Sequence, residues 1–86
     1  MSNLKYAIEG ILFAAGEPVK AAKLAVVLDV SIEEVKTAVE ELKEEYNTDK
    51  RGFNIIDIME GYQICSRPEY YTYIQEILGE QRNQPL

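Results

Sequence analysis

Apolar residues recur at helical spacing over the first fifteen positions of the chain. The positions that share one face are Leu4, Ile8, Ile11, Leu12 and Ala15, which fall at i, i+4, i+7, i+8 and i+11. This pattern predicts a helix from about Ser2 to Ala15, with Ser2 or Asn3 as its cap. Gly16 can end the helix in the left-handed conformation, and Pro18 prevents its continuation.

Two more helices are predicted before residue 47, separated by a tight turn at Asp29-Val30. The first spans Lys20 to Leu28, with Ala21, Leu24, Ala25 and Leu28 on its buried face. The second runs from Ile32 to about Tyr46, with Ile32, Val35, Val39, Leu42 and Tyr46 facing inward. Ser31 and Glu34 have the spacing of a capping box, in which each side chain binds a free backbone N–H at the helix start.

The pattern changes to strands after a polar break at residues 47–52. Phe53 to Met59 and Tyr62 to Ser66 are rich in Ile, Phe and Tyr, and Glu60-Gly61 separates them as a tight hairpin. Because Ile55 and Ile56 are adjacent, the alternation does not decide which of the two faces the core.

A fourth helix is predicted to begin at Pro68, a residue that suits the first helical turn. Its apolar side is formed by Tyr70, Ile74, Ile77 and Leu78. The chain thus reads as three helices, a hairpin and a helix, and its second and third helices have the helix-turn-helix spacing. We predict a mainly α (α+β) fold, a winged helix in which the hairpin is the wing, over residues 1–79.

The charge of the third helix opposes DNA binding, although a helix-turn-helix would insert this helix into the major groove. Six glutamates and two lysines give it a net charge of −4, within a chain of net charge −6. The charged residues are Glu33, Glu34, Glu40, Glu41, Glu44 and Glu45 against Lys36 and Lys43. DNA affinity depends largely on cations that neutralise phosphates. These glutamates are either an ordinary solvated helix face or an acidic docking surface for a basic partner.

The first helix carries a second apolar set, Tyr6 and Phe13, with Gly10 between them. At about 100° per residue these positions lie opposite the Ile8 stripe. One apolar face is usual for a surface helix, so two faces indicate a partner against the second, and Gly10 would admit that partner closely. The alternative is that the fourth helix or the strands cover Tyr6 and Phe13 within the same domain.

The residue inventory argues against catalysis and against a bound cofactor or metal. Histidine is absent, which removes the commonest general base and metal ligand. Cys65, the only cysteine, lies in a predicted strand and is interpreted as a small buried core residue. No apolar run approaches the roughly 20 residues that a membrane span requires, and no signal peptide is evident. We therefore expect a cytoplasmic protein that is not an enzyme.

Several segments resemble segregation and condensation protein B, the bacterial ScpB family. The segments are residues 7–18 (AIEGILFAAGEP), 24–28 with the Ser31 capping box, 39–46 (VEELKEEY), 51–53 (RGF), 61–64 (GYQI) and 67–70 (RPEY). The resemblance covers nearly the whole chain from about Leu4 to Leu86. Residues 7–18, Gly61-Tyr62 and residues 67–70 are its most specific parts.

This resemblance implies two winged-helix domains in series, homodimerisation through the N-terminal domain, and binding to the kleisin ScpA. Through the kleisin it implies association with the SMC ATPase in the complex that compacts and segregates chromosomes. The charge of the third helix and the lack of an apolar span predict no direct contact with nucleic acid or membrane. The second domain is missing here, and residues 80–86 resemble the start of the linker to it, so the chain is expected to be a fragment. The competing hypothesis is a winged-helix DNA-binding transcription regulator, which a basic strip across the third helix and wing would favour.

Overall fold

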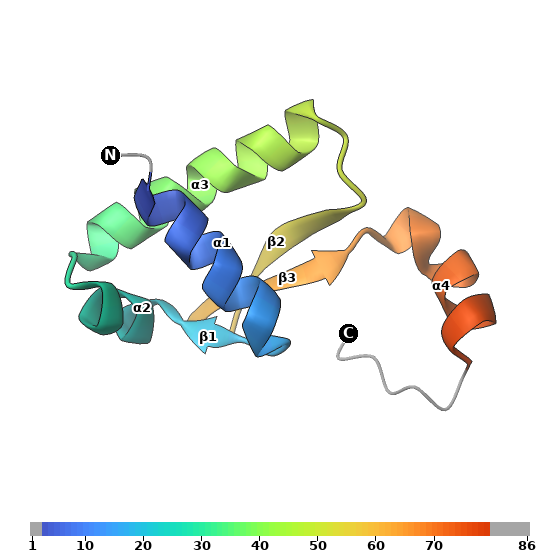
Figure 1. Ribbon diagram of the computed structural model, residues 1–86, viewed down its shortest axis with the longest axis horizontal. Coiled ribbons are helices and arrows are strands. Elements are labelled where there is room, and N and C mark those ends of the chain that lie inside the picture. The colour runs from blue at the N-terminus through green and yellow to red at the C-terminus, as the bar shows by residue number, and fades with distance from the viewer. Residues whose placement is uncertain (1–2, 80–86) are drawn as a thin grey trace.

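The computed structural model describes residues 3–79 and contains the predicted helices and hairpin (Figure 1). In chain order the elements are α1 (Asn3–Ala15), β1 (Val19–Lys20), α2 (Ala21–Leu28), α3 (Ile32–Thr48), β2 (Phe53–Ile58), β3 (Gly61–Ser66), the 3-10 turn η1 (Pro68–Tyr70) and α4 (Tyr71–Leu78). The three strands form one antiparallel sheet in the order β1-β3-β2. The predicted winged-helix fold is confirmed, whereas the short strand β1 was not predicted.

The core lies where α1, α2 and α3 meet one face of the sheet. Its most deeply buried side chains are Ile8, Leu12, Leu24, Val35, Val39 and Leu42, which come from all three helices. These are the positions that the helical periodicity predicts, and burying each one stabilises the fold by about 1.5–3 kcal/mol. Two predicted positions are exceptions, because Ala15 is the last residue of α1 and Ile32 the first of α3, and both are exposed.

The turn between α2 and α3 has the predicted form. Asp29 ends α2 in the left-handed conformation, with φ of 59°. The Ser31 hydroxyl accepts a hydrogen bond from the Glu34 backbone N–H at 3.1 Å. The Glu34 carboxylate in turn accepts one from the Ser31 N–H at 2.9 Å. The capping box is therefore confirmed at the start of α3.

The hairpin turn lies one residue earlier than predicted, at Met59-Glu60 rather than Glu60-Gly61. Met59 and Glu60 both have positive φ, 54° and 61°, as the favoured two-residue hairpin turns require at their central positions. Gly61 belongs to β3, where it pairs with Ile58 on one side and Lys20 on the other. A Cβ at this position would collide with the Val19 backbone carbonyl, so the sheet requires glycine there.

The register of the hairpin decides the question left open by the two isoleucines. Ile55 pairs with Ile64 and is buried in the core, whereas Ile56 pairs with Gln63 on the other face of the sheet. Cys65 lies on that other face and is half-buried, so its assignment to the core was wrong. Side chains of paired residues point to the same side of a sheet, which places Cys65 away from Ile55 and Ile64.

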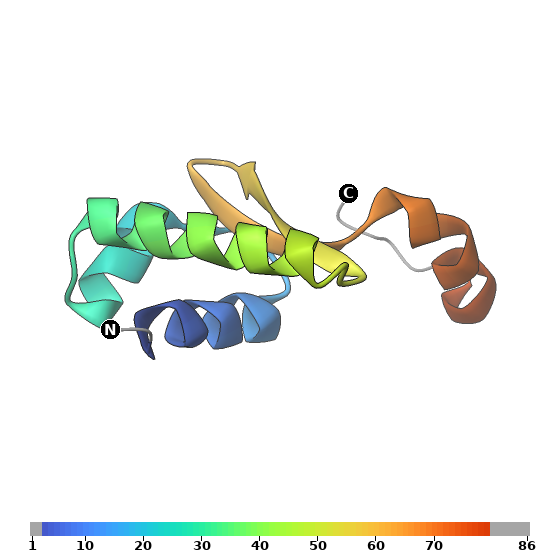
Figure 2. The same ribbon diagram turned by 90° about the horizontal axis from the view of Figure 1, so that it is seen from above.

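α4 stands apart from the rest of the fold (Figures 1 and 2). It follows η1 directly, and none of its eight residues is buried. Within residues 3–79 it has no extensive contact with α1, α2, α3 or the sheet. In the same residues no helix is long and apolar enough to cross a membrane.

Candidate protein interface

α1 has two apolar faces, as its sequence predicts. Ile8 and Leu12 are almost completely buried in the core. Tyr6 and Phe13 point away from it and are 52% and 80% exposed. The alternative, in which the strands or α4 cover these two aromatics within the same domain, is wrong in this structure. A phenylalanine with most of its surface in water leaves a large apolar area that a partner can cover.

Phe13 lies at the edge of an apolar groove between α1 and the sheet, which we call the α1 groove. Its lining residues are Glu9, Gly10, Phe13, Phe53 and Ile64, and it encloses about 340 Å³. A Cβ at Gly10 would meet no described atom within 4 Å, so packing within the chain does not require glycine there. The structure therefore brings Gly10 and Phe13 together at one site, with two sheet residues that sequence reasoning did not include.

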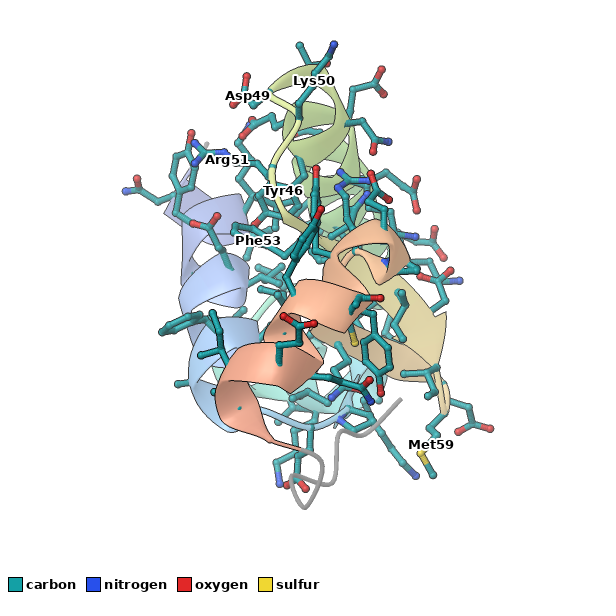
Figure 3. The ribbon with its side chains drawn as sticks, turned by 90° about the vertical axis from the view of Figure 1, so that its right-hand side faces the viewer. Tyr46, Asp49, Lys50, Arg51, Phe53 and Met59 are labelled. Atoms are coloured by element: carbon teal, nitrogen blue, oxygen red, sulfur yellow. The ribbon has the colours of Figure 1, made fainter. Side chains whose placement is uncertain are left out.

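The end of α3 supports one wall of the α1 groove. The Tyr46 and Phe53 rings meet edge to face, with centroids 5.0 Å apart and an interplanar angle of 74° (Figure 3). The Tyr46 hydroxyl donates a hydrogen bond of 2.6 Å to the Glu9 carboxylate. Burial, and then this bond, raise the pKa of Tyr46 well above its usual range. The phenol thus stays protonated and links α1 to α3 behind the groove.

Tyr6 does not line the α1 groove but lies one turn before it on the same helix face. The neighbouring Lys5 has its ammonium 5.5 Å from the centre of the Tyr6 ring. Lys5 also forms ion pairs with Glu45 and, at 3.7 Å, with Glu41 of α3. The hydrogen bond to Glu45 raises the pKa of Lys5. Of the three predicted interface residues, Tyr6, Gly10 and Phe13, the structure places two in the groove and one beside it.

The structure leaves two further apolar surfaces exposed, on α4 and on α2. On α4, Tyr73 and Ile77 are 66% and 82% exposed. On α2, Val26 is 79% exposed and Val27 lies beside it. The apolar surface of α2 was visible in the sequence, because residues 24–28 are all apolar and so cover every side of a short helix. A helix with a single buried face needs apolar residues on that side alone.

The acidic surface of α3 has few free cations near it. Lys43 binds Asp57 at 2.8 Å and Glu40 at 3.4 Å, so its charge is already compensated. Lys36 lines a hollow beside the wing that also contains Asp57 and Glu60. The helix and wing that would meet a duplex therefore present mainly carboxylates, and a polyanion would be repelled from them.

The described residues offer little chemistry. Between Asn3 and Gly79, no three His, Cys, Asp or Glu side chains gather closely enough to hold a metal ion. Burial raises the pKa of the Cys65 thiol, which keeps it protonated and weakly nucleophilic.

Comparison with known proteins gives a consistent result. The family model of the segregation and condensation complex subunit ScpB matches residues 6–86. A segregation and condensation protein B from Alkaliphilus oremlandii is 38% identical over 84 residues, which are 98% of this chain and 45% of that protein. One from Moorella thermoacetica is 41% identical over 76 residues, or 88% of this chain and 39% of that protein. The chain thus spans less than half the length of these relatives.

Two solved structures have the same fold. A dimer of an ScpB N-terminal domain complexed with an ScpA peptide superposes with a TM-score of 0.79 and 28% identity, covering 86% of this chain and 93% of that one. ScpB from Mycobacterium tuberculosis superposes with a TM-score of 0.84 over the whole of this chain and 54% of its own. At 21% identity, the second comparison supports the fold alone.

Proposed function

The chain belongs to the ScpB family of segregation and condensation complex subunits, and we propose that it works by pairing with a second copy of itself and binding a kleisin. In this proposal it is a non-catalytic domain of an SMC–kleisin complex that condenses and segregates chromosomes. It meets the kleisin ScpA directly and the SMC ATPase through that kleisin. It acts in the cytoplasm, at the nucleoid, and does not itself bind DNA.

The observation that carries the proposal is Phe13, which is 80% exposed at the edge of an apolar groove. A groove of this kind is covered in a working protein, because large exposed apolar areas mark interaction sites. The relative whose structure is a dimer of an ScpB N-terminal domain matches 86% of this chain. A second copy of the chain is therefore the partner that the groove fits best.

The apolar surface of α2 offers a separate place for the kleisin. Val26, 79% exposed, lines a shallow hollow with Pro18, Val19 and Lys23. α2 and α4 lie at opposite ends of the long axis of the molecule (Figure 1). No residue that lines this hollow also lines the α1 groove, so the two proposed contacts use different side chains. A peptide with apolar residues and an acidic group beside Lys23 would match it.

Two charge-introducing variants, Phe13→Glu and Val26→Glu, separate the two contacts. Both side chains are about four-fifths exposed, so neither substitution disturbs the core. Sedimentation of each variant, alone and with a kleisin ScpA peptide, gives the mass and the peptide affinity. We expect Phe13→Glu to abolish the dimer, and Val26→Glu to keep the dimer while weakening peptide binding.

A parent chain that is a dimer and stays one after Phe13→Glu would remove the α1 groove from the interface. Unchanged peptide binding by Val26→Glu would remove α2 from the kleisin contact. Tight binding of the parent to duplex DNA in ordinary salt would instead favour the transcription regulator.

A further inference from the structure

We infer that α4 is an exchanged arm, which packs its apolar face into the α1 groove of the second copy while its own groove receives the arm of that copy. This inference rests on the proposed self-association and names the segments that produce it. It assigns an occupant to two surfaces that a single chain leaves uncovered.

The first argument is the composition and exposure of α4. At 100° per residue, its apolar side chains share one side, whereas Thr72, Gln75 and Glu76 lie on the other. The apolar set is Tyr71, Tyr73, Ile74, Ile77 and Leu78. None of the residues Tyr71–Leu78 is buried, and Ile77 is 82% exposed. An eight-residue helix is too short to be stable in water by itself, so its apolar face needs a surface to pack on.

The second argument is the way in which Arg67 fixes the direction of α4. The Arg67 backbone N–H donates to the Gly52 carbonyl at 2.9 Å. Its guanidinium donates to the carbonyls of Arg51 and Tyr46, the latter at 3.2 Å, and to the Asn47 side chain at 3.0 Å. These bonds hold the end of β3 against the end of α3.

Pro68 follows this anchor and fixes its own φ, so little freedom remains before α4 begins. The chain is thereby directed outward, away from α1 and the sheet (Figure 2). Among the described residues that line the groove, none comes from α4.

The third argument is that the two surfaces match and are large enough. Among residues 3–79, Glu9 is the one charged residue that lines the otherwise apolar groove, and it already accepts a hydrogen bond from Tyr46. A two-fold axis would bring both arms into both grooves, so every contact occurs twice. Phe13 and Tyr73 from each of the two copies would alone bury on the order of 600 Å² of surface. With Ile77 and Leu78 from each copy, the contact approaches the roughly 1,200 Å² at which specific interfaces begin.

A crosslink that can form only between chains tests the exchange. In a Cys65→Ser background, one chain carries Gly10→Cys and a second chain carries Tyr73→Cys. The two are mixed and treated with a short bismaleimide. We expect a covalent dimer in the mixture and little in either chain alone. The matched control replaces Tyr73→Cys by Thr72→Cys, which lies on the polar side of α4 and should crosslink weakly.

A second variant pair measures the contribution of the arm to affinity. Ile77→Asp should weaken self-association at least thirtyfold, because two exposed side chains lose their burial in each dimer. Gln75→Asp, on the polar side of the same helix, should leave it unchanged. Ile77 is outside the core, so circular dichroism of both variants should match the parent.

The outcomes separate the inference from the function on which it rests. A parent chain that stays monomeric overturns both. A dimeric parent that is dissociated by Phe13→Glu, but neither weakened by Ile77→Asp nor crosslinked between chains, overturns the exchange and leaves the self-association standing. A crosslink within one chain that carries both cysteines, with none between chains, places the arm on its own groove and also overturns the exchange.

Discussion

Truncating Phe13 to alanine should separate the dimer without unfolding the chain. The neighbouring Leu12 provides the contrast, because it is 1% exposed whereas Phe13 is 80% exposed on the same helix. Leu12→Ala would leave a cavity in the core and should lower the free energy of unfolding by about 2–5 kcal/mol. Phe13→Ala removes no contact in the core, so it should change that free energy by less than about 0.5 kcal/mol.

The expected loss of affinity follows from the same exposure. Fully burying a phenylalanine contributes about 1.5–3 kcal/mol, and Phe13 has four-fifths of its surface available for burial. Two copies of the side chain would be buried in a symmetric dimer, which gives about 2–5 kcal/mol. This corresponds to a dissociation constant raised roughly thirtyfold to three-thousandfold.

Two measurements on the same samples check this prediction. Urea unfolding at a concentration where the parent is monomeric gives the free energy of unfolding, and sedimentation equilibrium gives the dissociation constant. The reasoning is refuted if Phe13→Ala loses several kcal/mol of folding stability while its dissociation constant stays at the parent value. That result would mean that Phe13 is packed within its own chain.

Three other predictions concern folding, pH and DNA. Gly61→Ala should destabilise the fold by about 1–3 kcal/mol in thermal or urea unfolding, because its Cβ collides with the Val19 carbonyl. The folded chain raises the pKa of Tyr46 above the ordinary value of 10.0. The protonated phenol therefore stabilises the fold fully below pH 10, and this stabilisation is lost as the pH rises through the higher pKa of the folded state. Urea unfolding across the alkaline range should therefore show falling stability, less steeply in Tyr46→Phe; equal slopes would contradict the assignment. Fluorescence anisotropy with duplex DNA at physiological salt should show no binding, given the carboxylates of α3, and a salt-dependent rise in anisotropy would count against this.

Much of the fold could be predicted because local rules and burial agree. The capping box at Ser31 and Glu34 and the buried face of α3 follow from spacing alone, and both appear in the structure. The hairpin turn was misplaced by one residue because Gly61, the usual turn residue, is needed instead for the close approach of β1. β1 has only two residues and carries no periodic signal that a sequence could show.

The candidate site was predicted only in part. Tyr6, Gly10 and Phe13 could be found because a helix with two apolar faces is visible in one segment of sequence. Phe53 and Ile64 could not, because their place opposite α1 depends on long-range packing of the sheet. The apolar side of α4 was recognised, but its separation from the core depends on the Arg67 anchor, which no periodicity reveals.

The most direct test is the solution mass of the unmodified 86-residue chain, measured by sedimentation equilibrium from micromolar to millimolar concentration. The mass should rise with concentration and level off at twice the 9.8 kDa of one chain. A mass that stays at 9.8 kDa over the whole range would contradict self-association through α1 and α4.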